Sequence, residues 1–209
     1  MTTNIGRLEQ IIRTIADTCV EQEGYFSDLD SVVGDGDFGY SLARGFEKLI
    51  EQWDTLPKES ASAFLQSVAL CLSSRIGGTS GPIWGTAFLR AGTAVKGVDE
   101  LKIQDVVAML RAAIAGIKAR GGAEVGDKTL LDALVPMTDN VEDLSTSGSQ
   151  TREIAVSAAK TARDAADAAS VLVARRGRAS YSGERSVGVP DPGAVAIAVL
   201  AERIAESWS

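Results

Sequence analysis

Residues 103–117 read IQDVVAMLRAAIAGI, and the apolar positions in this stretch recur at intervals of three and four. That spacing places them on one face of an α-helix. The positions concerned are Ile103, Val106, Val107, Leu110, Ile114 and Ile117. The same pattern occurs in residues 8–20, 42–53, 64–72 and 83–95, and no stretch shows the alternation typical of a strand.

Three more helices are expected towards the C-terminus. One spans about 128–145 and is expected to kink or break near Pro136, because proline lacks the amide that the helical turn needs. A second, over about 151–174, is rich in alanine, so its neighbours can approach closely. The third spans about 193–207. Eight helices joined by mostly short loops predict an all-α fold, an up-and-down bundle or barrel of eight antiparallel helices in a single domain, residues 1–209.

The composition excludes several classes of function. The formal net charge is −7 and no basic run occurs, so nucleic acid is not an expected partner. The chain contains no histidine, which excludes a Ser-His or Cys-His pair, a histidine zinc site and a phosphohistidine carrier. Cys19 and Cys71 are expected to be buried, reduced thiols. No signal or membrane-length apolar run is visible, so a cytoplasmic location is expected, without membrane contact.

An acidic loop between the first two predicted helices carries Asp30, Asp35 and Asp37 within eight residues. Carboxylates this close repel one another, and oxygen ligands without Cys or His favour Mg²⁺, Mn²⁺ or Ca²⁺ over zinc. The alternating ligands and closing Glu of an EF-hand are missing. An acidic turn whose aspartates cap the next helix explains the same residues, so the loop alone leaves both interpretations open.

Residues 77–82 read GGTSGP and precede an apolar helix, with Pro82 suited to a first helical position. Glycines let backbone N–H groups converge, and a helix N-terminus favours an anion. The loop lacks the Gly-Lys-Ser/Thr ending of a Walker A motif. Taken alone, it is more typical of a tight turn between helices.

Residues 175–185 read RRGRASYSGER, a polar stretch with four arginines that continues to Asp191 and Gly193. Guanidinium groups bind phosphate oxygens bidentately and glycines permit hinge motion, so this stretch can form a lid over phosphates. A solvated loop is the alternative, although long structureless loops in compact domains tend to be functional or disordered.

Five motifs together resemble the L subunit of dihydroxyacetone kinase, in order and from about residue 26 to 200. They are GDGDFG at 34–39, GGTSGP at 77–82, GDKT at 126–129 followed by DAL at 132–134, GRASY at 177–181 and DPG at 191–193. The resemblance implies a barrel of eight antiparallel helices with the nucleotide site in the loops at one end.

The resemblance also assigns residues to ligands, and implies that the chain binds ADP or ATP with two Mg²⁺ ions. Asp30, Asp35 and Asp37 would hold the ions, and with Arg178 would be the catalytic residues. The resemblance implies that Gly78, Thr79 and Ser80 contact the phosphates and that Phe38 and Ser41 also contact the nucleotide. Gly121 and Leu130 would line the adenine pocket. Asp191 and Gly193 would belong to the lid together with Arg178.

By resemblance, the chain is a kinase subunit that passes the γ-phosphoryl group of Mg-bound ATP to a short-chain ketose. The ketose, dihydroxyacetone or a four-carbon sugar such as erythrulose, would be held covalently on a histidine of a separate K subunit. The lack of histidine in this chain fits an arrangement in which the K subunit supplies the histidine.

Phe38 departs from the pattern of phosphotransferase-system members, which often have His after Gly-Asp-Gly-Asp. This difference favours direct use of ATP over a permanently bound ADP that a phosphocarrier protein rephosphorylates. A third hypothesis is a nucleotide-loaded regulator that binds a transcription factor. A structural bundle without ligand ranks last, because it leaves the acidic and glycine-rich loops unexplained.

Overall fold

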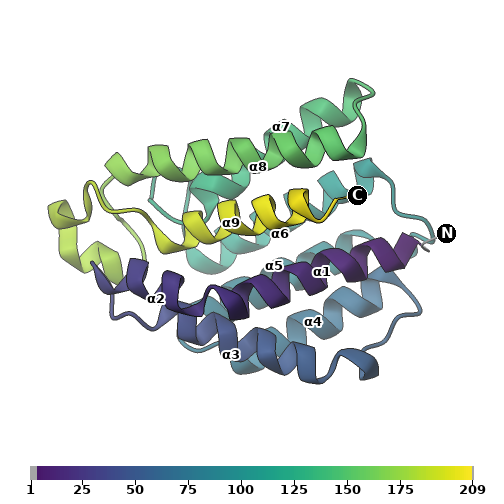
Figure 1. The fold of residues 1–209 in the computed structure, drawn as a ribbon, viewed down its shortest axis with the longest axis horizontal. Helices are drawn as coiled ribbons and strands as arrows, with labels where there is room; N and C mark the ends of the chain where they lie inside the picture. Colours follow the sequence, from purple (N-terminus) through teal and green to yellow (C-terminus); the bar gives the residue numbers. More distant parts are fainter. Residues whose placement is uncertain (1–3, 209) are drawn as a thin grey trace. The chain divides into compact units, whose positions relative to one another are not determined.

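The computed structural model describes residues 4–208, and within that range it contains helices and no strands. The expectation of an all-α fold is confirmed (Figure 1). The described elements are α1 (Asn4–Glu21), α2 (Glu23–Ser31), α3 (Phe38–Glu51), α4 (Ala61–Arg75), α5 (Ser80–Ala94), α6 (Ile103–Gly121), α7 (Leu131–Thr146), α8 (Thr151–Ala168) and α9 (Pro192–Glu206), with short 3-10 segments η1 (Trp53–Thr55), η2 (Ala169–Val171) and η3 (Arg178–Ser186).

Helix α2 is the element that the periodicity did not predict. Only Gln22, with φ −95° and ψ 14°, separates it from α1, and the buried Phe26 anchors it. A helix of nine residues with one buried apolar side chain shows no repeating pattern. Part of the expected acidic loop is therefore helical, because Asp30 lies in the last turn of α2.

Two predicted boundaries also differ from the structure. Helix α7 continues through Pro136, so the helix does not break there, because the proline removes only the hydrogen bond to the carbonyl of Asp132. Helix α8 ends at Ala168 rather than near residue 174, and η2 follows it directly.

By its contacts the chain divides into two compact units. The first contains residues up to Val20 together with Ser41–Gly121, and the second contains Glu21–Tyr40 together with residues 122 onward.

In the first unit, α4, α5 and α6 pack side by side at glycines. A Cβ on Gly85 of α5 would overlap the Ser73 hydroxyl of α4, and one on Gly116 of α6 would lie 3.0 Å from the Thr86 methyl group of α5. These contacts require the absence of a side chain, so the glycines set the spacing of the three helices.

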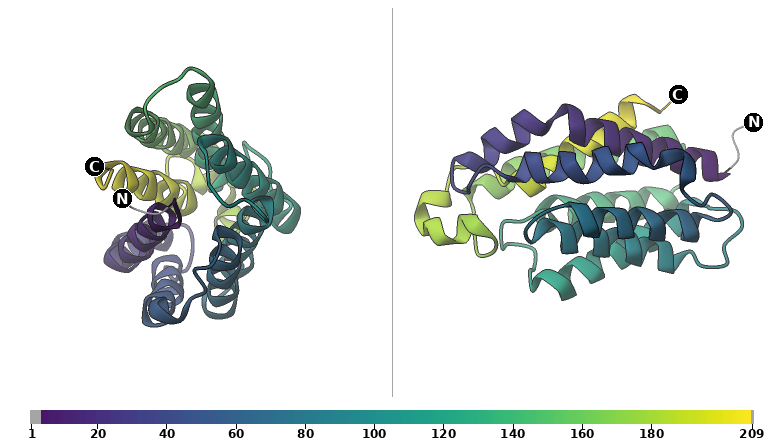
Figure 2. Two further views of the ribbon diagram at one scale, coloured as in Figure 1. Left: turned by 90° about the vertical axis from the view of Figure 1, so that its right-hand side faces the viewer. Right: turned by 90° about the horizontal axis from the view of Figure 1, so that it is seen from below.

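In the second unit, α7, α8 and α9 run alongside one another, as Figures 1 and 2 show from three sides. Buried alanines of α8, among them Ala158 and Ala162, permit the close approach that the alanine-rich sequence predicted. Arg163 of α8 also donates two hydrogen bonds, of 2.8 and 2.9 Å, to the Glu202 carboxylate of α9. No helix in the described part of the chain is long and apolar enough to span a bilayer.

Candidate functional site

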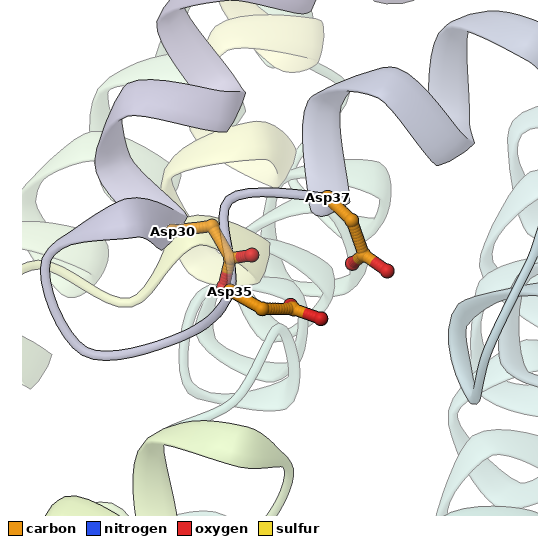
Figure 3. Close-up of side chains that lie close together, drawn as sticks. All are labelled: Asp30, Asp35 and Asp37. Atoms are coloured by element: carbon orange, nitrogen blue, oxygen red, sulfur yellow. The ribbon is translucent and has the colours of Figure 1, made fainter.

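The three aspartates of the acidic loop gather at the junction of α2 and α3. Asp30 lies at the end of α2, Asp35 in the loop, and Asp37 immediately before α3. Figure 3 shows their carboxylates close to one another, and one oxygen of each lies within 4.8 Å of the others. Asp30 is half-buried, whereas Asp35 and Asp37 are exposed. A cation could therefore reach all three carboxylates from solvent.

The loop conformation depends on Gly34 and Gly36. The N–H of Gly34 donates to the Asp30 carbonyl at 2.6 Å, and a Cβ on Gly34 would overlap a carboxylate oxygen of Asp30. Gly36 has φ +75°, a conformation that side chains disfavour. The N–H of Phe38 lies 3.4 Å from the other Asp30 carboxylate oxygen. The turn therefore folds back on Asp30 and brings the later aspartates to it.

The negative charges of the three aspartates in the acidic loop repel one another. Partial burial and, next, the charge of Asp35 raise the pKa of Asp37, whereas the charge of Arg178 lowers it. Three hard oxygen donors with unfavourable mutual repulsion are the donor set that Mg²⁺ prefers. The residues present thus fit the predicted magnesium site.

Arg178 lies beside this cluster in the structure. Its guanidinium is 2.9 Å from the Asp35 carboxylate, and both side chains are partly exposed. The hydroxyl of Ser182, from the same segment, lies 3.4 Å from the Val33 carbonyl. The structure therefore brings Arg178 to the acidic loop.

Leu130, Asp191 and Gly193 form a second group in the same unit. A Cβ on Gly193 would lie 3.1 Å from an Asp191 carboxylate oxygen and 3.3 Å from Leu130. Asp191 is the N-cap of α9 and accepts the Ala194 N–H at 2.8 Å. Burial raises the pKa of Asp191 to about 7, with the charge of Asp132 adding to this effect.

The remaining predicted nucleotide contacts, Ser41, Gly78, Thr79, Ser80 and Gly121, belong to the first unit. Helix α5 begins at Ser80, two residues before Pro82, and Gly78 has φ +61°. The N–H groups of the first helical turn have no partner within the helix, so this end can receive an anion.

Ser41 and Gly121 have different surroundings within this unit. A Cβ on Gly77 would lie 3.3 Å from the Ser41 hydroxyl, so Ser41 neighbours the turn that leads into α5. Gly121 is the last residue of α6.

Sequence reasoning gave no role to Lys128 and Asp127, although both lie in the quoted GDKT motif. Both are buried, Lys128 at 2% exposure. The Lys128 ammonium donates to three carbonyls that lie 42 to 58 residues later in the chain. The available signal was an adjacent Asp and Lys directly after a glycine in that motif.

Comparisons with known proteins show the family to which the chain belongs. The family model described as the DAK2 domain matches residues 32–206. The chain is 37% identical over 184 residues to the PEP-dependent dihydroxyacetone kinase, ADP-binding subunit DhaL, of Escherichia coli strain K12, covering 87% of this chain and 86% of the relative. It is 35% identical over 198 residues to the L-erythrulose 1-kinase of Mycolicibacterium smegmatis, covering 94% of this chain but only 34% of that longer protein.

The fold is shared with a solved structure, the dihydroxyacetone kinase from C. freundii in complex with AMP-PNP and Mg²⁺. The TM-score is 0.77 at 25% sequence identity, covering 95% of this chain and 33% of the other. The expected resemblance and the assignment as a kinase subunit are confirmed by these relatives. Because the family match extends over most of the sequence and the E. coli relative is matched over nearly its whole length, the chain belongs to the DAK2 domain family.

Proposed function

We propose that the chain is the nucleotide-binding subunit of a ketose kinase and transfers the γ-phosphoryl group of ATP. The observation that carries the proposal is the cluster of Asp30, Asp35 and Asp37 with Arg178 beside it. Phosphoryl transfer needs carboxylates that hold metal, a positively charged side chain that binds phosphate, and backbone N–H donors at the phosphates. The cluster supplies the first two groups, and the helix start at Ser80 supplies the third.

In this proposal Asp30, Asp35 and Asp37 hold two Mg²⁺ ions. When bound, Mg²⁺ neutralises charge on the phosphate oxygens. Arg178 binds phosphate from the neighbouring segment, because its guanidinium can form two parallel hydrogen bonds to phosphate oxygens. We assign no general base to this chain.

The other nucleotide contacts follow from the same proposal. Gly78, Thr79 and Ser80 donate to the phosphates, with Phe38 and Ser41 near them. Gly121 and Leu130 line the adenine site, and Asp191 and Gly193 support the lid. The match over residues 32–206 includes residues of both compact units, which supports the assignment of the sequence to a single domain family.

The acceptor in this proposal is a short-chain ketose held on a separate K subunit. The relatives are named for dihydroxyacetone and for L-erythrulose, which supports this substrate class. We place the reaction in the cytoplasm, because Cys19 and Cys71 are both free, buried thiols of the kind that reducing compartments maintain.

A second candidate retains the same site but changes the phosphoryl donor. The E. coli relative is named as the ADP-binding subunit of a PEP-dependent kinase. In that alternative, ADP stays bound and a phosphocarrier protein rephosphorylates it. Phe38, which stands where phosphotransferase-system members often have His, favours ATP as the direct donor. Rapid exchange of bound nucleotide with labelled ATP supports the first candidate, and tightly held, non-exchanging ADP supports the second.

Asp35→Asn tests the proposal. We expect phosphorylation of dihydroxyacetone, in the presence of a ketose-binding K subunit, to fall at least about a hundredfold, because one metal-binding carboxylate is removed. Thermal unfolding should change little, since Asp35 is exposed. The matched control is Asp28→Asn, an exposed aspartate of α2 outside the cluster, which should retain turnover. Unchanged turnover in Asp35→Asn would contradict the assignment.

A further inference from the structure

A buried lysine lies at the base of the segment that carries Arg178. Lys128 is 2% exposed, and its ammonium donates to the carbonyls of Ser170 at 2.8 Å, Leu172 at 3.0 Å and Ser186 at 2.6 Å. An ammonium has three N–H donors, so these hydrogen bonds use all of them. The side chain is thus fully engaged in one set of backbone acceptors.

The three acceptors lie on both sides of residues 175–185, which we name the arginine loop. Ser170 and Leu172 precede the loop and Ser186 follows it. Two further hydrogen bonds join the same ends: Ala174 N–H to the Ser186 hydroxyl at 2.9 Å, and Gly188 N–H to the Ser170 carbonyl at 2.9 Å. Lys128 therefore closes the base of the arginine loop.

Asp127 adds two contacts from the adjacent position. Its carbonyl accepts the Arg175 N–H at 3.0 Å, and its carboxylate lies 3.3 Å from the Arg176 guanidinium. The Asp127 carboxylate also accepts the Glu124 N–H at 3.0 Å, which fixes its orientation. The turn before α7 thus holds the start of the arginine loop as well as its base.

The backbone at Lys128 is unfavourable for a residue with a side chain. Its φ is +62°, in the left-handed region, and it is the one described residue other than glycine with positive φ. Burial lowers the pKa of its ammonium, and the charge of Asp191 opposes that effect. A buried cation in such a conformation persists only where the surrounding contacts offset the cost of burial and of backbone strain. Such residues cluster at functional sites.

We propose that Lys128 is a positioning residue, which fixes the arginine loop so that Arg178 stays at the acidic cluster and meets the nucleotide phosphates. The three carbonyl contacts close the base of the arginine loop, and the loop carries Arg178 to its 2.9 Å ion pair with Asp35. The nucleotide part of this inference rests on the proposed function, whereas the anchoring of the loop does not.

Limited proteolysis tests the anchoring without nucleotide. Trypsin cleaves after Arg, so the four arginines of the loop report its opening directly. In Lys128→Met we expect cleavage within residues 175–185 to be about tenfold faster, roughly the effect of losing one charge-assisted hydrogen bond. The control is Lys160→Met, the same change at an exposed lysine of α8 that pairs with Asp164. Equal cleavage rates in the two variants would overturn the inference.

A double-mutant cycle on MgADP affinity tests the route through Arg178. Lys128→Met should weaken binding about tenfold in the wild-type background and have no further effect in Arg178→Met, because the loop then has no guanidinium to position. Equal weakening in both backgrounds would show a general structural role and overturn the inference. In turnover, we expect the KM for nucleotide to rise more than kcat falls.

Two other outcomes remain interpretable. If wild-type protein fails to bind MgADP, the proposed function fails, and the trypsin comparison still decides whether Lys128 anchors the loop. If Lys128→Met does not fold, Lys128→Gln, which lacks the charge and leaves at least one of the three carbonyls without a donor, is measured in the same two assays, with the same direction of change expected. Wild-type cleavage rates and wild-type affinity in Lys128→Gln would then contradict the inference.

Discussion

Asp191 is the residue whose proton binding depends most clearly on the fold. As the N-cap of α9 it accepts the Ala194 N–H, which favours the charged carboxylate. Burial dominates, however, and with the charge of Asp132 it raises the pKa to about 7 from an ordinary value of 3.8. Lys128 is the nearby cation that opposes this rise.

Asp191→Asn should change how stability depends on pH. Because the folded-state pKa lies above the unfolded one, the folded protein holds a proton that the unfolded chain releases between about pH 4 and 7. Wild-type stability therefore falls as pH rises through that window. Asn keeps a cap acceptor but cannot ionise. We compare the free energies of unfolding of the variant and of the wild type at pH 5 and at pH 8. The variant's value minus the wild-type value should be about 1–2 kcal/mol larger at pH 8 than at pH 5. This change is within the limit of ~1.4 kcal/mol per pH unit for one ionising group.

Urea unfolding at a series of pH values measures this difference. Asp164→Asn serves as the control, because Asp164 is an exposed residue of α8 paired with Lys160. Its stability should follow the wild-type pH profile in parallel. Parallel profiles for Asp191→Asn and wild type would show that Asp191 is ionised in the folded protein at pH 5.

At the scale of elements, the turn between α2 and α3 determines whether the acidic cluster forms. Gly39 at the start of α3 shows how tightly the two helices meet, since a Cβ there would overlap the Glu23 carbonyl and lie 2.6 Å from the Ser27 nitrogen. The Ser27 hydroxyl accepts the Tyr40 N–H at 3.2 Å. The turn has no room for added atoms on this side.

A pair of glycine substitutions tests this turn. Gly34→Ala places a Cβ against the carboxylate of Asp30 and 2.7 Å from its carbonyl oxygen. We expect it to lower the free energy of unfolding by about 1–3 kcal/mol and to weaken Mg²⁺ binding, because Asp30 must move. Gly24→Ala, at a position of α2 with nothing within 4 Å, should instead raise stability by about 0.5–1 kcal/mol.

Both values come from chemical unfolding, with Mg²⁺ binding measured by calorimetry. A Gly34→Ala protein with wild-type stability and wild-type Mg²⁺ affinity would show that the turn accommodates a side chain and does not fix Asp30.

The elements predicted well are those with a long repeating apolar face. The pattern of residues 103–117 predicted α6, which spans Ile103–Gly121. Helix α2 was missed because Phe26 is its one buried side chain, which leaves no period to detect. Pro136 was expected to kink or break its helix, and the helix does not break because one lost hydrogen bond is offset by the packing of α7 against α8 and α9. Periodicity therefore detects helices with a long buried face but not a short helix with one buried side chain.

At the scale of the whole chain, sequence motifs predicted that the three aspartates of the acidic loop gather but not what holds the arginine loop. The spacing of Asp30, Asp35 and Asp37 within one loop was sufficient to predict their cluster. The partners of Lys128 could not be predicted, because the carbonyls that it binds belong to Ser170, Leu172 and Ser186, which only the fold brings near. Backbone acceptors carry no signature in the amino-acid sequence.

Calorimetric titration of ADP into the wild-type protein, once with Mg²⁺ and once with EDTA, measures whether the acidic cluster binds nucleotide through the ion. Since the carboxylate cluster is proposed to bind phosphates through Mg²⁺, removing the ion should weaken ADP binding at least about a hundredfold, equivalent to ~2.7 kcal/mol. The account predicts a clear 1:1 isotherm with Mg²⁺ and little heat with EDTA. Equal affinities in the two titrations, or no binding in either, would contradict it.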